Sequence, residues 1–470
     1  MPLWRASKDP RRDHGCGPKV GGRRMSAKLP PGLQTAPLVS DWVRPDGDGL
    51  ALRTGRAELG QGVQAAMLRI ASWELGMPVE RLSITGPDTG ASPDEGVTAG
   101  SLSMSQGGAA MRAATSAARV LCLAEAGRRL NTEAGRLSVI DGLIFEAGID
   151  TGLTLPDIAA QTDLDRPVTD HAAPLGQPLD ADETSRHDLR ARMVGAPFVH
   201  DLSPEGLLHG RIFAPPSIHA HLPDGLDLAA LEARPGVVAV IRDGNFLGLV
   251  AETGAEADAA LAWFEARLDW EGVPDAPSDP HPLLEASTAP IETTEEPASP
   301  LPAREPAIDL TSRRQFISHA PMGPSAAVAE WTDQGLTVWS HSQGVYPLRA
   351  AMAEVLKMDA EAIRVIHTPG PGCYGHNGAD DVALDAALLA RAVPGRPVRL
   401  VWSRAGEFRT APLGAAMATR VQVWLDGGAI LAARVSVTSP PHSTRPSTGG
   451  APYLRAGAMI EGGAPFPPAP

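Results

Sequence analysis

Cysteine, aromatic residues and long apolar runs are all scarce in this sequence. Its three cysteines (Cys16, Cys122 and Cys373) are too few for a disulfide framework and lack the spacing of a zinc site, so we expect a reducing compartment, the cytoplasm. No apolar run approaches the length of a membrane-spanning helix, and the basic N-terminus lacks the apolar core of a signal peptide. We therefore expect residues 1–26 to form a disordered basic extension.

Positive charge is also in short supply. The formal net charge of −14 argues against nucleic acid and anionic membranes as partners, because both attract basic surfaces. Hydrophobic residues make up 43% of the 470 residues and charged residues 20%, which is typical of a soluble globular chain with about two to four domains. The 49 glycines and 45 prolines predict many tight turns and long structured loops.

The most informative stretch is residues 367–392, which read HTPGPGCYGHNGADDVALDAALLARA. An apolar run at residues 363–366 precedes four glycines, and an amphipathic helix with acids in its first turn follows them. Glycines between a strand and a helix let the backbone approach a ligand and point amide donors at it. We therefore expect this loop to bind an anion with many oxygens, such as a phosphate, a pyrophosphate or an oxo-metal group.

Two other interpretations of this loop stay open. Residues 370–375 (GPGCYG) fit the glycine fingerprint of a nucleotide-binding Rossmann unit, although the third glycine lies ahead of the helix and the next strand ends in Ser-Arg rather than in an acid. The other interpretation is a metal site with three or four side-chain ligands from the loop. Its candidate ligands are His367, Cys373, His376 and Asp380.

Two patterns of the same kind occur nearly three hundred residues apart. Each consists of a strand, a Gln-Gly turn, a helix, a second strand and a glycine-rich loop. The first occupies residues 49–100 and leads into a long alanine-rich helix at 103–130, and the second occupies residues 336–378. We expect a true repeat, whose two turns face each other and grip one large anionic cofactor.

A different module lies between the two patterns. Residues 190–215 predict two strands joined by a turn, and residues 226–270 predict a helix, two strands and a second helix. The proline-rich and acidic residues 273–310 have no apolar periodicity and are predicted to be a surface linker. Residues 451–470 are predicted to be irregular.

Four motifs in a consistent order resemble the large, molybdenum-cofactor-binding subunit of the molybdenum hydroxylases, the xanthine dehydrogenase and aldehyde oxidase family. They are ELGQG (58–62), TAGSLS (98–103), SQG (342–344) and GCYG (372–375). Residues 192–202 (RMVGAPFVHDL) are similar to the strand that opens the family's hammerhead domain. The order of these segments resembles the two-subunit bacterial branch typified by nicotinate dehydrogenase and isoquinoline oxidoreductase.

The resemblance implies an α+β fold, in which molybdenum-cofactor-binding α/β segments flank an α+β hammerhead-like domain. The implied segments are the disordered extension at 1–26, an N-terminal molybdopterin-binding segment at 27–188, the hammerhead-like domain at 189–272, the linker at 273–310, a second molybdopterin-binding segment at 311–450, and the irregular tail at 451–470. The family's subunits continue further, so the chain is expected to be C-terminally truncated.

The implied cofactor is molybdopterin with molybdenum, in its cytosine dinucleotide form. Gln343 resembles the glutamine that hydrogen-bonds an oxo ligand of the metal, a task that suits a neutral amide donor. Tyr374 and Gly375 replace the family's Phe-Gly pair, whose backbone reaches the metal centre. The other implied contacts, to the pterin and its phosphates, come from Gly60, Gln61, Gly100, Ser101 and Ser103.

The implied reaction is hydroxylation of an N-heteroaromatic or aldehyde carbon with oxygen from water. Electrons would leave through 2Fe–2S clusters on a small partner subunit, towards a cytochrome or another acceptor. The family's catalytic glutamate lies in a second cofactor-binding half that this sequence lacks, so we assign no catalytic residue and no metal ligand and expect little activity from the chain alone. The alternatives are a Rossmann-type NAD-binding oxidoreductase and a non-catalytic cofactor-binding scaffold fragment.

Overall fold

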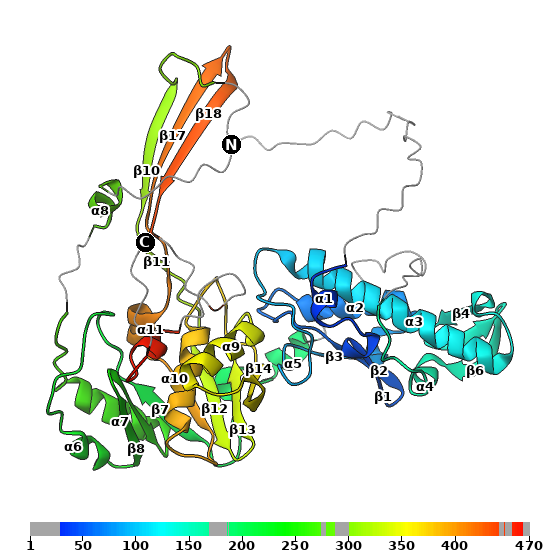
Figure 1. The fold of residues 1–470 in the computed structure, drawn as a ribbon, viewed down its shortest axis with the longest axis horizontal. Helices are drawn as coiled ribbons and strands as arrows, with labels where there is room; N and C mark the ends of the chain where they lie inside the picture. The colour runs from blue at the N-terminus through cyan, green and yellow to red at the C-terminus, as the bar shows by residue number, and fades with distance from the viewer. Residues whose placement is uncertain are drawn as a thin grey trace.

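The computed structural model describes residues 29–168, 186, 188–273, 279–286, 300–440, 446 and 454–463. The predicted N-terminal extension lies wholly outside these residues, as do parts of the predicted linker and residues 451–453 and 464–470 of the predicted tail. The described chain is a mixture of helices and strands, which confirms the predicted α+β class (Figure 1). No helix in these ranges is both long and apolar enough to cross a membrane.

The first lobe, blue to teal in Figure 1, is formed by residues 29–168. Its strands are β1 (Val43–Asp46), β2 (Gly49–Arg53) and β3 (Leu82–Thr85). β1 is antiparallel to β2, and β2 is parallel to β3. Helix α2 (Val63–Leu75) connects the parallel pair and ends at Gly76, whose positive φ of 68° is the usual left-handed end of a helix.

Helix α3 (Ala109–Leu130) packs against α2 and completes the core of this lobe. The helix predicted at 103–130 is present, but its first turn, Ser103–Gly108, is a π-helix and not an α-helix. This turn passes over a buried ion pair in which Arg56 Nε lies 3.1 Å from Glu95 Oε1. A Cβ on Gly107 would lie 2.9 Å from side-chain atoms of both residues, so the wider turn and the glycine make room for the pair.

The far end of this lobe is a second, smaller sheet. Its antiparallel strands are β4 (Leu137–Ile140), β5 (Leu143–Glu146) and β6 (Ile149–Thr154). Thr154 caps the short helix α4 (Leu155–Ala159) by accepting a hydrogen bond from the Asp157 amide. A short helix, α1 (Gly32–Thr35), begins the described chain.

The second lobe is built on one mixed sheet of seven strands in the order β14-β13-β12-β15-β7-β9-β8. Its strands are β7 (Leu208–Ile212), β8 (Val237–Asp243), β9 (Phe246–Ala251), β12 (Ala326–Thr332), β13 (Gly335–Ser340), β14 (Ile363–His367) and β15 (Val398–Val401). β7, β8 and β9 come from the predicted hammerhead-like range, and the other four come from the second predicted molybdopterin-binding segment. The two ranges thus share one sheet, and the boundaries drawn between them stay a prediction.

Helices cover both faces of this sheet. α10 (Ala379–Ala390) lies on one face, where a Cβ on Gly210 of β7 would come within 2.6 Å of Leu389. α7 (Gly254–Glu265) packs against β7 and β9 on the other face, and the short α6 (Leu228–Glu232) packs on β8. Every residue of β9 is consequently buried, as expected for a strand covered on both sides.

The two predicted strands and two predicted helices of residues 226–270 are confirmed, but the first predicted strand of residues 190–215 is wrong. That stretch begins with a helix, α5 (Leu189–Met193). The Asp188 carboxylate holds the helix, because it pairs with Arg192 one turn later at 2.9 Å and with Arg186 at 2.7 Å. Only the second predicted strand, β7, forms.

The second lobe repeats the topology of the first. β12 is antiparallel to β13, and helix α9 (Val345–Leu356) joins β13 to its parallel partner β14. The equivalent elements of the first lobe are β1, β2, α2 and β3. In both copies a short 3-10 helix precedes the last strand of the unit, at Val79–Arg81 before β3 and at Ala360–Ala362 before β14. The predicted repeat is therefore present as two ββαβ units.

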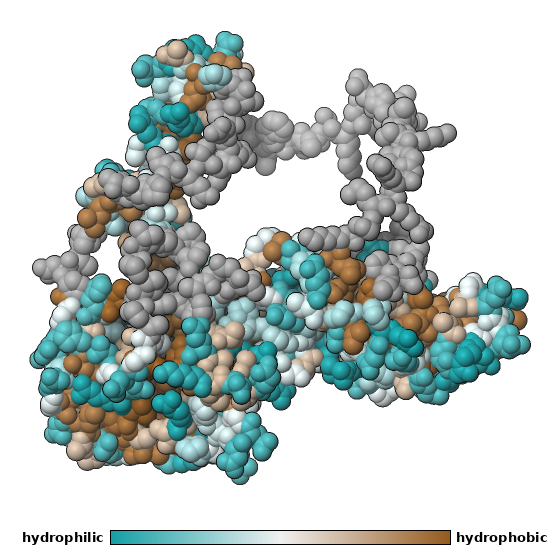
Figure 2. Space-filling model, viewed as in Figure 1, coloured by the Kyte–Doolittle hydropathy of each residue, from teal (hydrophilic) through white to brown (hydrophobic). Residues whose placement is uncertain are grey.

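A further three-stranded sheet projects away from the second lobe (Figure 1). Its antiparallel strands are β10 (Ile308–Arg314), which begins inside the predicted linker, β17 (Met417–Asp426) and β18 (Ala429–Thr438). One of its faces carries Asp309 paired with Arg420, whereas the other is apolar and includes Leu310 and Val435. Figure 2 shows hydrophobic residues at the surface of this projection.

Smaller elements connect this projecting sheet to the lobe. They are α8 (His281–Glu285), β11 (Ile317–Ser318), α11 (Arg404–Thr410) and β16 (Leu413–Gly414). The described part of the predicted irregular tail also differs from expectation. It forms a 3-10 helix, Arg455–Ala458, that packs on α10.

Candidate functional site

The first Gln-Gly turn, residues 59–62, is organised around the carboxylate of Glu58, which is only 2% exposed. One oxygen of this carboxylate accepts the Gly60 and Gly62 amides at 3.0 and 2.9 Å, and the other accepts the Gln64 amide at 3.2 Å. Gly62 begins helix α2 with a φ of 77°, so the buried charge also neutralises the positive end of the helix. Glu58 therefore positions the whole turn.

The side chain of Gln61 is also used within this turn. Its carbonyl oxygen accepts the Leu59 amide at 2.6 Å, and its amide nitrogen donates to the Ala57 carbonyl at 2.8 Å. Gly60 has a φ of 105° and an exposed backbone, and its carbonyl accepts a hydrogen bond from Arg186 at 2.6 Å. Of the residues predicted here, Gly60 is thus the one whose backbone has open space beside it.

The loop that carries Gly100 and Ser101 joins the first turn through Thr98. The hydroxyl of Thr98 accepts the Ala57 amide at 2.8 Å. Gly100 and Ser101 both have left-handed backbones, with φ values of 64° and 58°, which is uncommon for a serine. Ser103 follows at the start of the π-helix. The predicted phosphate contacts therefore lie on a sharply turned, exposed backbone.

The second Gln-Gly turn contacts this loop directly. Gln343 accepts the Thr98 amide through its backbone carbonyl at 2.8 Å, and its side-chain amide donates to the Thr98 carbonyl at 2.7 Å. Ser342 shapes the turn, because its hydroxyl accepts the Gly344 amide at 3.0 Å and donates to Asp380 at the start of α10. The two repeats are thus joined at their turns.

His367 makes a second junction between the turns. It is the last residue of β14, and its imidazole ring is buried between two backbone carbonyl groups. Nδ1 lies 3.0 Å from the oxygen of Ser342, and Nε2 lies 3.1 Å from the oxygen of Glu58. Burial lowers the pKa of the ring, against a raising effect of both carbonyl groups and of the Glu58 charge.

Further contacts hold the two lobes together beside these turns. Arg364 pairs with the buried Asp88 at 2.6 Å, and the Val365 amide donates to the Thr89 hydroxyl at 2.9 Å. The phenol of Tyr346 donates to a backbone carbonyl in the same loop. Several contacts therefore hold the two turns next to each other, as the predicted repeat implies.

The glycine loop between β14 and α10 passes over several close neighbours. A Cβ on Gly370 would lie 2.9 Å from Nδ1 of His341, and one on Gly378 would lie 2.2 Å from the Trp402 ring. Gly375 has a φ of 124°, and Tyr374 beside it is 56% exposed. These glycines are needed for close packing on the inner side of the loop, while Tyr374 faces outward.

The acidic residues at the start of α10 are buried rather than facing water. Burial raises the pKa of Asp381 to about 7 and also raises that of Asp385, one turn later. Arg455 of the 3-10 helix donates its backbone amide to Asp381 at 2.7 Å and its guanidinium to Asp385 at 3.0 Å. This cluster was not predicted from the sequence, although an acid in the middle of an otherwise apolar helix was a signal for it.

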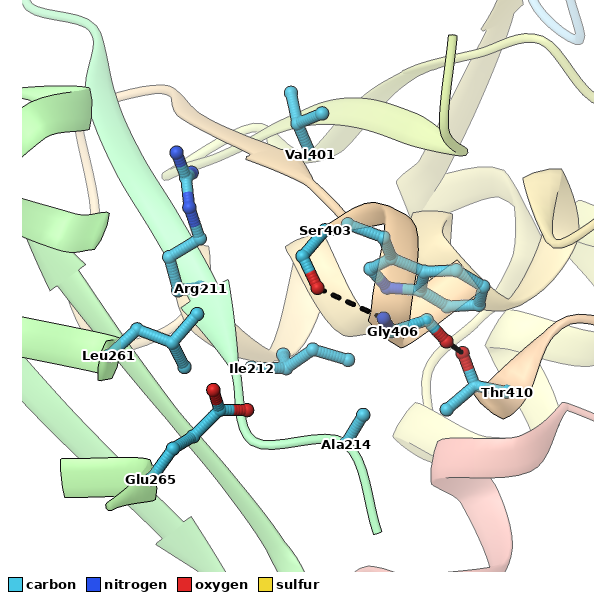
Figure 3. A pocket seen from close by; sticks show the side chains of 10 residues that line it. Arg211, Ile212, Ala214, Leu261, Glu265, Val401, Ser403, Gly406 and Thr410 are labelled. Carbon is cyan, nitrogen blue, oxygen red and sulfur yellow. Dashed lines mark hydrogen bonds between the residues drawn. The ribbon is translucent and has the colours of Figure 1, made fainter. Parts of the chain in front are cut away.

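Two hollows in the second lobe do not involve the predicted residues. The first, between β7, α7 and α11, has a volume of about 10 Å³ and can hold no more than a single water (Figure 3). The second, of about 340 Å³, lies between residues 215–220, Arg409 and the 3-10 helix at 455–458. Neither is lined by any of the eight predicted cofactor-binding residues.

Comparison with known proteins decides the family. A molybdopterin cofactor-binding domain model matches residues 12–195, and a second model of the same description matches residues 303–454. The chain is 30% identical to a nicotinate dehydrogenase subunit of Pseudomonas putida over 418 residues, which cover 84% of this chain. This chain belongs to the molybdenum hydroxylases. The matched residues cover 34% of that relative, so the chain spans about a third of its length.

Other molybdenum hydroxylases match over shorter ranges. The aldehyde oxidoreductase molybdenum-binding subunit PaoC of Escherichia coli K12 is 38% identical over 98 residues, which cover 21% of this chain and 13% of that protein. Among solved structures, quinoline 2-oxidoreductase from Pseudomonas putida 86 matches 54% of this chain and 38% of that chain, with 21% identity and a TM-score of 0.40. An aldehyde oxidoreductase from Desulfovibrio desulfuricans matches 54% and 34%, with 18% identity and a TM-score of 0.44.

In this molybdenum hydroxylase chain, the predicted site residues fall into two groups. Gln343 contacts Thr98, two residues before Gly100, and His367 contacts Glu58, two residues before Gly60. The first group (Gly60, Gln61, Gly100, Ser101, Ser103 and Gln343) therefore lies on neighbouring segments. The second group, Tyr374 and Gly375, lies further along the glycine loop, where a Cβ on Gly375 would approach His319. The roles of all eight in cofactor binding stay predictions.

The metal-site interpretation of the loop gains no support. The ring of His367 lies between carbonyl groups, and His376 Nε2 lies 3.9 Å from the nearest Asp380 oxygen. Within the described ranges, no three or more histidine, cysteine or acidic side chains are arranged to hold a metal ion.

Proposed function

We propose that this chain is the molybdopterin-binding portion of a large subunit that hydroxylates an N-heteroaromatic or aldehyde carbon, with water as the oxygen source. The names of the two curated relatives, a nicotinate dehydrogenase subunit and an aldehyde oxidoreductase subunit, support these substrate classes. The observation that carries the proposal is the reciprocal contact between Thr98 and Gln343, at 2.8 and 2.7 Å. It supports a shared site because it joins the segments matched by the two molybdopterin-binding models.

The residues around the turns fit a large pterin with phosphate groups. Apart from each glycine and its two chain neighbours, no described residue has an atom within 4 Å of the position that a Cβ on Gly60 would take, and only the Leu102 side chain approaches that position on Gly100. The exposed backbone at both glycines can therefore come close to a ligand. The amide nitrogen of Asn377, in the glycine loop, and Nδ1 of His341, beside it, are buried and have no hydrogen-bond partner in the described chain.

In this proposal the cofactor, in its cytosine dinucleotide form, supplies the two-electron oxidation when it is bound. The chain binds and orients it. The backbone amides of Gly100 and Ser101 would donate to the phosphates, and the exposed backbone of Gly60 would lie against the pterin. Gln343 would donate a hydrogen bond near the metal without adding charge. Tyr374 would face the substrate from the glycine loop. We assign no residue of this chain as the catalytic base.

Electron transfer requires a partner in this proposal. A 2Fe–2S cluster needs four protein ligands, and the chain has only three cysteines. Cys122 is buried in the first lobe, where burial raises its pKa to about 12, and Cys373 lies in the glycine loop of the second lobe. A small subunit with 2Fe–2S clusters, followed by a cytochrome or another acceptor, would take the electrons, and the low cysteine count favours a cytoplasmic location.

The cofactor content of the purified chain tests the proposal. We expect molybdenum by elemental analysis and a cytosine nucleotide after acid release, in equal amounts. Gln343→Ala should lower both about tenfold, because it removes a donor to the cofactor and one contact between the lobes. Gln334→Ala, in the exposed turn between β12 and β13, is the matched control and should change neither. Bound NAD would favour the Rossmann alternative, and a folded chain with neither ligand would favour the scaffold.

A further inference from the structure

The ring of His367 connects backbone groups that are far apart in the sequence. Its two nitrogens face the carbonyl oxygens of Ser342 and Glu58, at 3.0 and 3.1 Å. These carbonyls come immediately before the two Gln-Gly turns, one in each lobe. His367 as a whole residue is 9% exposed and lies at the end of β14, where the glycine loop begins.

Both residues that receive these contacts shape their own turns. The carboxylate of Glu58 accepts the Gly60 and Gly62 amides, so a shift of its backbone moves the first turn. The hydroxyl of Ser342 accepts the Gly344 amide, so a shift of its backbone moves the second turn. A single side chain is therefore coupled to the geometry of both turns.

We propose that His367 is a positioning residue whose ring ties the two Gln-Gly turns together and so sets their relative position around the cofactor. The part of this inference that concerns the cofactor rests on the proposed function. The part that concerns the turns does not, because it follows from the two contacts alone. A neutral imidazole has one N–H, so at neutral pH the ring donates to only one of the two carbonyls at a time. One tautomer donates to the Ser342 carbonyl and the other to the Glu58 carbonyl, so the two turns use the same donor alternately.

Other contacts keep β14 in place when the ring is changed. The His367 backbone amide donates to the Pro87 carbonyl at 2.8 Å, and the Val365 amide donates to the Thr89 hydroxyl at 2.9 Å. Arg364 holds Asp88 at 2.6 Å. Substitutions of the ring are therefore expected to leave the lobes docked, which makes the inference testable in the full chain.

Two substitutions separate the two contacts. In His367→Asn the side-chain nitrogen takes the place of Nδ1, which keeps the contact with Ser342 and removes the one with Glu58. In His367→Gln the nitrogen takes the place of Nε2, which keeps the contact with Glu58 and removes the one with Ser342. Val365→Ala is the matched control, because it shortens a fully buried side chain on the same strand and leaves the ring of His367 in place.

Hydrogen exchange measured by mass spectrometry on the purified 470-residue chain reads out each turn. We expect His367→Asn to speed amide exchange about fivefold in residues 57–64 only, and His367→Gln to do the same in residues 341–346 only, as for the loss of one buried hydrogen bond. The inference is overturned if either variant matches the wild type at both turns, or if each variant loosens both turns to the same extent.

The cofactor content of the same samples tests the dependent part. Both His367 variants should retain about fivefold less molybdenum and cytosine nucleotide per chain than Val365→Ala. Equal content in the three variants would refute the role in cofactor binding. A wild-type chain without molybdenum would instead refute the proposed function and leave the exchange result to decide the role of the ring.

Discussion

Replacing Asp381 by asparagine should stabilise the protein at high pH and have little effect at low pH. The carboxylate of Asp381 is buried on α10, and burial raises its pKa to about 7, with smaller raising effects from the charges of Asp385 and Asp380. The Arg455 backbone amide and charge oppose this shift. Asparagine keeps an oxygen that can accept the Arg455 amide, so the substitution removes the charge and preserves the shape.

The direction follows from proton binding in the two states. In the unfolded chain an aspartate has a pKa of about 3.9, so between about pH 4 and 7 the folded state holds a proton that the unfolded state has lost. The free energy of unfolding therefore falls as the pH rises through this window and stays low above it. A shift of roughly three pKa units corresponds to about 4 kcal/mol, and relaxation around the ionised carboxylate reduces the cost to about 2–4 kcal/mol.

Urea unfolding of the wild type and of Asp381→Asn at pH 5, 7 and 8.5 measures the effect. We expect nearly equal stabilities at pH 5 and an advantage of about 2–4 kcal/mol for the variant at pH 8.5. Asp224→Asn, at an exposed position, is the control and should show no such trend. A difference between wild type and variant that does not change with pH would refute the reasoning.

Two further substitutions test the packing of the site. Glu58→Gln replaces a buried acceptor of three backbone amides by a group whose NH₂ must face some of those amides. We therefore expect the free energy of unfolding to fall by about 2–3 kcal/mol and amide exchange at Gly60 and Gly62 to become faster. A midpoint of urea unfolding equal to that of the wild type would contradict the assigned role. Gly378→Ala places a methyl group 2.2 Å from the Trp402 ring, so we expect a loss of about 1–3 kcal/mol and a change in tryptophan fluorescence, and an unchanged spectrum would show that the ring does not lie there.

Much of the local structure could be predicted because its signals are local. The two β-α-β patterns were visible from strand and helix periodicities, and Gly76 marked the end of α2. The helix α5 was not predicted, because it depends on ion pairs of Asp188 with Arg186 and Arg192 that compete with the apolar residues around it. Such a competition is decided by side-chain geometry, which the pattern of residue types does not contain.

The neighbourhood of the site residues was predicted less well than their identity. Motif similarity pointed to Gln343 and Gly100, but their shared contact through Thr98 depends on how two distant segments dock. His367 was considered only as a metal ligand, because a sequence shows a histidine and not the two carbonyl oxygens that converge on its ring. The burial of Asp381 likewise depends on a segment that follows it by more than seventy residues.

The order of strands in the seven-stranded sheet has a consequence for synthesis. β7 pairs with β9 soon after both leave the ribosome, but its other edge is completed by β15, where Val398 is in register with Leu208. At about 5–20 residues per second, the ribosome needs roughly 10–40 s to make the intervening chain. During that time the free edge of β7 exposes unpaired amides and carbonyls, so the nascent chain is open to mispairing until residue 401 has emerged.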